Sequence, residues 1–249
     1  MNLIRQERIK AYVEDKNVAT IKELKELFPE VSLMTIHRDL NALEEQGTIT
    51  KHRGMVKFTP YKDDVDFHIR MRENNPGKLS MVKKALTLIQ PHSSVFLDAG
   101  TSNLILAQNL PDISLNVVTT SPGIALELCR LHNPIVTVCC GVMNRKNMAV
   151  SGQNTLEMLD KINIDIAFVG VSGYSETGGF TCGAESDMLL KRNVIQKART
   201  SVMMCGAEKL KRLMPYTFAD MKDVDYIITD DAMPEEFIKA AEKAGTALL

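Results

Sequence analysis

The sequence predicts an α/β protein, with a small helical domain at the N-terminus and a larger, doubly wound, mostly parallel α/β domain after it. Two observations predict this class. Up to about residue 60, short charged segments carry apolar residues at helical spacing; after residue 79, apolar strands alternate with helices. The 249 residues suffice for two domains. We therefore place the domains at residues 1–59 and 79–249, with a linker at residues 60–78.

Composition excludes several other classes. Hydrophobic residues make up 45% and charged residues 24% of the chain, which is typical of globular proteins and not of disordered or coiled-coil ones. No apolar run approaches the roughly 20 residues of a membrane span, and the N-terminus lacks the apolar core of a secretion signal. The 5 cysteines form no Cys-x-x-Cys pair and favour neither disulfides nor zinc. We expect a cytoplasmic protein without metal, cofactor or membrane partner.

Three helices are expected in the first domain. The first spans residues 2–16, and the second spans residues 20–28 and opens with a Thr-x-x-Glu capping box. Pro29 ends the second helix, and Ser32 is a suitable N-cap for a third helix at residues 32–46. One face of the third helix is apolar, and we expect that it packs on the other two helices through Leu33, Ile36, Leu40 and Leu43.

The opposite face of the third helix and the segment after it carry side chains suited to DNA. Residues 49–51 and 56–58 alternate around a turn at residues 52–54, as in a β-hairpin. A helix for the major groove beside a hairpin that contacts phosphates is the arrangement of a winged helix-turn-helix. The side chains expected to contact DNA are Ser32, Met34, Thr35, His37, Arg38, Asn41, Lys51, Arg53 and Lys57.

The alternative for this domain is a small helical interaction module. Residues 1–60 have 10 basic and 9 acidic residues, so their overall charge does not indicate DNA binding. The basic residues nevertheless gather on the third helix and the hairpin, where a DNA-binding domain needs them. We therefore favour DNA binding.

In the second domain we expect a parallel sheet with helices on both faces, because apolar strands are joined by helices. The predicted strands are residues 95–97, 117–118, 135–139, 164–171, 201–204 and 226–229. The predicted helices end at residues 89, 110 and 131 or span residues 155–161, 185–198 and 234–244.

Ligands of such sheets bind beyond the carboxyl ends of the strands. Small and hydroxyl-bearing residues follow two predicted strands at residues 98–102 and 119–123, and a third such run spans residues 173–183. Backbone donors and hydroxyls at helix starts suit a phosphate, although ordinary helix capping is the alternative for either loop alone. The residues expected to bind an effector are Asp98, Gly100, Thr101, Ser102, Thr119, Thr120, Ser121, Gly173, Thr181, Glu185, Lys191 and Lys209.

Five runs in the two domains carry a resemblance to a known family: VSLMTIHRDLNALE at 31–44, LDAGTS at 97–102, VVTTS at 117–121, AFVG at 167–170 and VDYIITD at 224–230. In these runs and in their order, essentially the whole chain resembles the DeoR family of bacterial transcription regulators. The resemblance implies a winged helix-turn-helix joined to a sensor domain similar to sugar-phosphate isomerases, in an oligomer whose operator affinity changes when a phosphorylated sugar binds. Most members repress catabolic operons and release DNA on binding the metabolite.

The chain departs from the family pattern at three places. His37 stands where the family usually has arginine, and residues 53–55 (RGM) stand where its hairpin usually reads His-Gly-Gly. Residues 206–209 (GAEK) replace an Asp-x-Ser-Lys signature and keep only Lys209. The first two departures concern the operator sequence, and the third concerns the ligand.

The predicted function is a DNA-binding transcription regulator, a repressor of a carbohydrate-metabolism operon. Its partners would be a double-stranded operator with palindromic or repeated half-sites, a small phosphorylated sugar, and further copies of itself in a dimer or tetramer. We expect no enzyme activity. The alternative is a sugar-phosphate isomerase-like enzyme with an accessory helical domain, in which Glu185 or Asp98 serves as the base.

Overall fold

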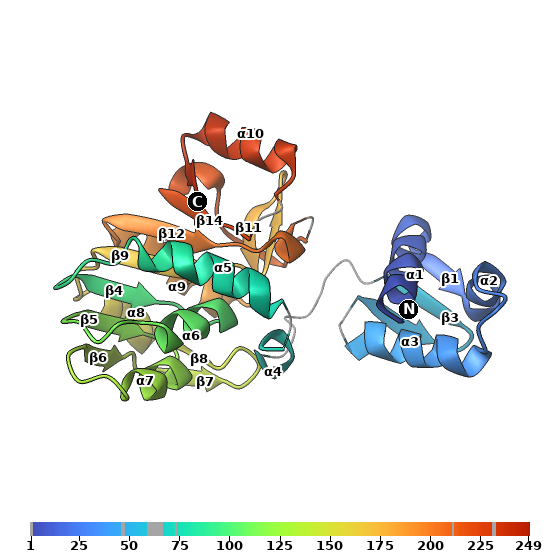
Figure 1. Ribbon diagram of the computed structural model, residues 1–249, viewed down its shortest axis with the longest axis horizontal. Helices are drawn as coiled ribbons and strands as arrows, with labels where there is room; N and C mark the ends of the chain where they lie inside the picture. The colour runs from blue at the N-terminus through green and yellow to red at the C-terminus, as the bar shows by residue number, and fades with distance from the viewer. Residues whose placement is uncertain (1, 46–47, 59–66, 73, 211, 231–232) are drawn as a thin grey trace. The chain divides into compact units, whose positions relative to one another are not determined.

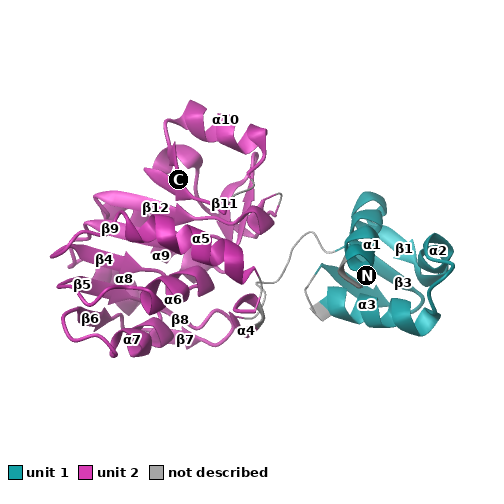
Figure 2. Cartoon of the chain, viewed as in Figure 1, with its two compact units in different colours: residues 1–65 teal, residues 66–249 magenta. Residues whose placement is uncertain are grey.

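The computed structural model describes residues 2–45, 48–58, 67–72, 74–210, 212–230 and 233–249. The chain divides into two compact units, Met1–Val65 and Asp66–Leu249 (Figure 2). The expected end of the third helix at residues 46–47 lies outside the described residues, as do residues 59–66 and 73 of the expected linker.

The N-terminal unit combines helices with a small antiparallel sheet whose strand order is β1-β3-β2. The three expected helices and the expected hairpin are confirmed. Strand β1, which pairs with β3, was not predicted from the sequence. The elements are α1 (Asn2–Lys16), β1 (Val18–Thr20), α2 (Ile21–Leu27), α3 (Leu33–Glu45), β2 (Ile49–His52) and β3 (Met55–Phe58).

The core of this unit is one apolar cluster to which all three helices contribute, including Ile9, Leu24, Ile36, Leu40 and Leu43. The prediction that Leu33 belongs to this face was wrong, since Leu33 is 50% exposed. Leu33 is the first residue of α3 and lies at the end of the packed stripe.

A polar contact inside this unit also escaped the sequence pattern. Asp39 of α3 is fully buried and accepts hydrogen bonds from Arg5 Nε at 2.5 Å and from Gln6 Nε2 at 3.2 Å. These contacts join α1 to α3, so the position of α3 depends on a buried carboxylate as well as on apolar packing.

The C-terminal unit is built on a parallel sheet of seven strands in the order β15-β14-β12-β9-β4-β5-β6 (Figure 1). All strand pairs in it are parallel, which confirms the predicted α/β class. The strands are β4 (Ser94–Leu97), β5 (Asn116–Thr119), β6 (Ile135–Val138), β9 (Ile166–Gly170), β12 (Thr200–Met204), β14 (Tyr226–Ile228) and β15 (Ala247–Leu248).

Helices cover both faces of this sheet, because successive strand residues point to opposite sides. Val95 and Leu97 belong to one apolar core with α5, α6 and α7, and Phe96 belongs to a second core with α8, α9 and α10. In Figure 1, α5 and α6 lie on the near face of the sheet. The helices are α5 (Asn75–Leu86), α6 (Thr101–Gln108), α7 (Pro122–Leu128), α8 (Gln153–Leu159), α9 (Glu185–Lys197) and α10 (Glu235–Ala244).

The order of the strands places a topological switch between β4 and β9. From β4 the chain continues to β5 and β6 on one side, and later to β9, β12, β14 and β15 on the other side. In open α/β sheets, the crevice at the carboxyl ends of the strands beside such a switch is the usual ligand position. The loops after β4, β5 and β9 therefore frame the candidate effector site.

Several smaller elements differ from the predictions. The run at residues 173–183, expected to be a loop, contains the whole β10–β11 hairpin, which extends into an antiparallel sheet through β13. Helix α5 begins at Asn75, earlier than the predicted residue 79. The remaining elements are α4 (Phe67–Arg70), β7 (Val142–Asn144), β8 (Ala149–Ser151), β10 (Gly173–Ser175), β11 (Gly179–Cys182), η1 (Ala207–Lys209), β13 (Tyr216–Ala219) and η2 (Met221–Asp223).

Candidate DNA-binding surface and effector site

The turn before α3 is held by side-chain hydrogen bonds. Ser32 Oγ accepts a hydrogen bond from Thr35 N at 3.1 Å, as an N-cap does, and lies 2.9 Å from Thr35 Oγ1. Lys25 Nζ donates to the carbonyl oxygens of Pro29 at 2.7 Å and Val31 at 2.6 Å. The angle between α2 and α3 is therefore set by polar contacts to the backbone of the turn.

The outward face of α3 presents side chains with few internal contacts. Met34 is 83% exposed, and His37 and Arg38 are also exposed. Within the described part of the chain, the guanidinium group of Arg38 makes no hydrogen bond or ion pair. An exposed guanidinium without an internal partner is free to form two hydrogen bonds to a base or a phosphate.

The hairpin β2–β3 forms a wing attached to α3. Lys51 Nζ donates a hydrogen bond to Asn41 Oδ1, and Lys51 N donates to Glu44 Oε1 at 2.7 Å. Gly54, at the turn, has φ 79°, a left-handed conformation that glycine adopts without strain. Arg53 beside it is exposed. The contacts of Lys51 fix the wing against the helix.

The nine residues expected to contact DNA thus take three roles. Ser32 and Thr35 form the cap of α3, and Asn41 and Lys51 bind each other. The other five have exposed side chains that make no hydrogen bond or ion pair in the described part of the chain: Met34, His37, Arg38, Arg53 and Lys57.

In the C-terminal unit, the helix after β4 begins without a side-chain cap. Gly100 is the N-cap residue of α6 and makes no side-chain hydrogen bond, and the space above its Cα is open. Neither Thr101 nor Ser102 uses its hydroxyl group in a hydrogen bond to any described residue. The first backbone N–H groups of a helix have no partner within the helix and carry partial positive charge, so this end is suited to an anion.

The loop after β5 lies beside this helix start, because Thr119 pairs with Leu97 in adjacent strands. Thr119 Oγ1 donates to Leu97 O at 2.7 Å and accepts from Ser121 N at 3.0 Å. Ser121 caps α7 through Ile124 N, at 3.3 Å. Thr120 Oγ1, by contrast, is buried and has no hydrogen-bond partner. Capping therefore accounts for Ser121 but not for Thr120.

Asp98 and Lys191 form a buried ion pair at the topological switch. Their side chains are 2% and 4% exposed. Lys191 Nζ also donates to Gly170 O at 2.9 Å, and Asp98 Oδ2 accepts from Gly170 N at 2.9 Å. Burial alone would lower the pKa of Lys191, but the charges of Asp187 and Asp98 outweigh it and raise that pKa. The pair holds α9 against the ends of β4 and β9.

Sequence reasoning missed Asn103 on α6. Its Nδ2 donates to the carbonyl oxygens of Asp98 and Phe168, each at 3.0 Å, so it joins the ends of β4 and β9. Asn103 Oδ1 is buried without a partner. The signal available in the sequence was a single amide side chain directly before the apolar run LILA at residues 104–107.

Four of the expected effector residues take other positions. Gly173 and Thr181 belong to the β10–β11 hairpin, where Thr181 Oγ1 donates to Gly173 O at 2.9 Å. Glu185 is exposed in the first turn of α9. Lys209 is in η1, and its Nζ lies 3.5 Å from Glu208 Oε1. The other eight of the twelve gather around β4 and its neighbours: Asp98, Gly100, Thr101, Ser102, Thr119, Thr120, Ser121 and Lys191.

Two matches to known families cover most of the chain. Residues 5–60 match the family described as DeoR-like helix-turn-helix domain, and residues 73–231 match the family described as DeoR C terminal sensor domain. The chain belongs to the DeoR family of transcriptional regulators. Membership implies that the helix-turn-helix domain of this DeoR-family protein binds DNA and that its sensor domain binds a small molecule.

Curated relatives of this DeoR-family protein are transcriptional regulators. It is 33% identical over 247 residues to the uncharacterized HTH-type transcriptional regulator YgbI of Escherichia coli (strain K12), with 98% of this chain and 96% of that protein covered. It is 28% identical over 251 residues to the HTH-type transcriptional repressor GlcR of Bacillus subtilis (strain 168), with 99% and 96% covered. A solved ribose 5-phosphate isomerase A from Methanocaldococcus jannaschii matches with 18% identity and a TM-score of 0.40, over 55% of each chain.

Two other features are absent from the described part of this DeoR-family protein, a membrane-spanning helix and a cluster of metal ligands. None of its helices has both the length and the apolar character needed to cross a membrane. No group of three or more His, Cys, Asp or Glu side chains among the described residues could hold a metal ion.

Proposed function

We propose that this DeoR-family chain is a repressor of a carbohydrate-metabolism operon, and that a phosphorylated sugar bound in the sensor domain lowers its affinity for the operator. The observation that carries the proposal is that each unit has a surface whose polar groups lack internal hydrogen-bond partners. In the N-terminal unit, the exposed face of α3 carries Arg38, whose guanidinium has no internal partner. In the C-terminal unit, the uncapped start of α6 follows β4, and the unpartnered hydroxyl of Thr120 follows the adjacent strand β5.

On the DNA side, α3 enters the major groove, and Met34, His37 and Arg38 reach the base edges. Arg53 at the tip of the wing and Lys57 on β3 contact the flanking phosphates. Ser32, Thr35, Asn41 and Lys51 hold the helix and wing in place, and their remaining hydrogen-bonding capacity faces the same groove. A dimer or tetramer would present such helices to palindromic or repeated half-sites.

On the effector side, the phosphate binds at the N-terminus of α6. Its oxygens accept hydrogen bonds from the backbone of Gly100 to Ser102 and from the hydroxyl groups of Thr101, Ser102 and Thr120. The buried pair of Asp98 and Lys191 supports this loop from below. Lys209 closes on the ligand from η1, which follows β12.

The effector regulates DNA binding if its affinity differs between the state of the protein that binds DNA and the state that does not. A coupling free energy of about 1–3 kcal/mol changes operator affinity roughly 5- to 150-fold. The Lys209→Ala variant tests the pocket, because calorimetry should show weaker binding of the effector. Undiminished affinity would contradict the role of this lysine.

We infer a regulator and not an isomerase-like enzyme. A general base must reach the proton that it removes. Asp98 is instead held by Lys191 and by Gly170 N, and Glu185 is exposed in the first turn of α9. The curated relatives reported above are named as transcriptional regulators, which supports the same choice.

The test is fluorescence anisotropy of the full chain with labelled DNA from upstream of its own gene. It is measured at two salt concentrations, with and without a pool of sugar phosphates. We expect salt-dependent, sequence-selective binding that the pool weakens and that the corresponding unphosphorylated sugars leave unchanged. Equal affinity for an unrelated duplex would contradict sequence-selective binding to this DNA. Turnover of an aldose or ketose phosphate would favour the isomerase-like enzyme.

A further inference from the structure

The sensor domain contains a cavity of about 460 Å³ that none of the sites above uses. Its walls come from three segments: β10 with the turn after it, Leu210 just after η1, and the start of α10. An isolated bridge between Tyr174 and Leu210 holds two of these segments together. The volume lies within the roughly 300–1,000 Å³ that is usual for small-molecule pockets.

The inner walls are apolar and aromatic. The rings of Tyr174 and Phe237 have centroids 5.0 Å apart and planes at 84°, an edge-to-face contact that fixes both rings. Leu210 and Pro234 complete this part of the lining. These side chains can enclose the hydrocarbon part of a ligand.

Tyr174 places a polar group in this apolar setting. The residue is only 7% exposed, yet its hydroxyl makes no hydrogen bond to any described residue. Burial raises the pKa of Tyr174, and the negative charge of Glu176 raises this pKa further by a smaller amount. The phenol therefore stays neutral and can donate or accept a hydrogen bond. A hydroxyl group of a cavity-lining side chain that has no protein partner is available to a ligand.

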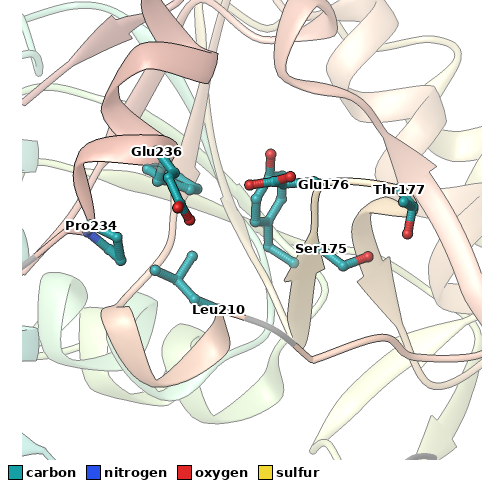
Figure 3. A pocket seen from close by; sticks show the side chains of 8 residues that line it. Ser175, Glu176, Thr177, Leu210, Pro234 and Glu236 are labelled. Atoms are coloured by element: carbon teal, nitrogen blue, oxygen red, sulfur yellow. The ribbon is translucent and has the colours of Figure 1, made fainter.

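Two carboxylates, of Glu176 and Glu236, stand on either side of the cavity (Figure 3). Neither forms a hydrogen bond or an ion pair with a described residue. The neighbouring acid on α10 behaves differently, because Glu235 Oε1 pairs with Lys239 Nζ at 2.7 Å. None of the described residues that line the cavity is basic. Among the described residues, the lining thus combines two carboxylates that have no basic partner with the aromatic side chains of Tyr174 and Phe237.

We propose that this cavity binds a small organic cation, with an ammonium or guanidinium group between Glu176 and Glu236 and an apolar body against Tyr174 and Phe237. A carboxylate binds such a group by charge-assisted hydrogen bonds, and aromatic rings attract it further by their negative faces. Anions are repelled here. The site therefore differs in charge from the phosphate site at α6, and its ligand is a different class of molecule.

The test is isothermal titration calorimetry of the full chain at low ionic strength, with phenethylamine as the probe and 2-phenylethanol as its uncharged analogue. We expect the amine to bind and the alcohol to bind at least tenfold more weakly, because only the amine is a cation at neutral pH. Glu176→Gln and Glu236→Gln should each weaken amine binding about tenfold, and the double variant should abolish it.

The matched control is Glu235→Gln, which removes the same charge from the same helix turn but outside the cavity. It should leave amine affinity unchanged. Equal binding of amine and alcohol, equal effects of Glu235→Gln and Glu236→Gln, or no amine binding at millimolar concentration would each overturn the proposal. DNA affinity, measured in parallel, reports on the proposed repressor function separately.

Discussion

Lys191 of α9 and Asp98 at the end of β4 are 93 residues apart in the sequence, yet they form a buried ion pair at the topological switch of the sheet. Their charges compensate each other in a site from which water is nearly excluded. Each side chain also bonds to the backbone of Gly170, so the pair joins β4, β9 and α9. The shape of the proposed effector site therefore depends on two charges that need not contact the ligand.

Removal of one partner should destabilise the sensor domain strongly. Lys191→Met leaves Asp98 charged and buried, which typically costs about 3–5 kcal/mol in the free energy of unfolding. Urea denaturation measures this. The control is Lys239→Met, since Lys239 is 70% exposed and such pairs contribute at most about 1 kcal/mol. Similar losses for the two variants would contradict the structural role of Lys191.

Thr119 and Thr120 are adjacent but should respond differently to replacement by valine. Thr119→Val removes a hydroxyl that bonds to Leu97 O and Ser121 N, and it should cost about 1–3 kcal/mol of stability. Thr120→Val removes a buried hydroxyl without a partner, so stability should stay the same or rise. In thermal unfolding, inorganic phosphate should raise the unfolding temperature of the wild type but not that of Thr120→Val. Retained stabilisation would exclude Thr120 from the phosphate site.

The sequence predicted the elements better than the contacts between them. The apolar spacing of Ile36, Leu40 and Leu43 predicted the buried face of α3, because helical periodicity is a local property. Asp39 lies next to that stripe, and nothing local distinguishes a buried aspartate from a solvated one. Its burial depends on Arg5 and Gln6, which only the folded unit brings near.

The same limit applies to the effector site. Small and hydroxyl-bearing residues after β4 and β5 indicated a phosphate site, since parallel strands end at one edge of the sheet. The pattern could not tell Ser121, which caps α7, from Thr120, which has no partner. It also treated residues 173–183 as a ligand loop, although they contain the β10–β11 hairpin, in which Thr181 Oγ1 bonds to Gly173 O. This run is rich in glycine, serine and threonine, and these residue types are common to turns and ligand loops, so they did not distinguish a hairpin from a binding loop.

Arg38 should carry sequence-selective affinity for the operator. Arg38→Ala removes an exposed guanidinium without an internal partner, so we expect a loss of about 1–3 kcal/mol in DNA binding with the fold unchanged. Lys57→Ala should instead weaken binding to all duplexes alike. It should also reduce the salt dependence of the binding constant by the equivalent of about one phosphate contact. Lys10→Ala, on α1, is the control of equal charge. Anisotropy titrations in which all three variants behave alike would argue against a specific role for α3.

The capping box of α2 should make the N-terminal unit sensitive to acid. Glu23 accepts hydrogen bonds from Thr20 N at 2.7 Å and from Lys16 Nζ at 2.9 Å. The Thr20 backbone N–H first, and then the Lys16 ammonium, lower the pKa of Glu23 to about 2, from an ordinary value of 4.5. Because the folded-state pKa is the lower one, the carboxylate stabilises the fold above about pH 4.5, and this contribution is lost as the pH falls towards 2.

The variant Glu23→Gln isolates this effect, because glutamine can occupy the same capping position without a charge. Chemical denaturation of the wild type and of Glu23→Gln, followed by circular dichroism, gives their stability difference at each pH. We expect the wild type to be more stable at neutral pH and the difference to shrink between about pH 5 and pH 3. A difference that stays constant over this range would show that the charge of Glu23 does not stabilise the start of α2.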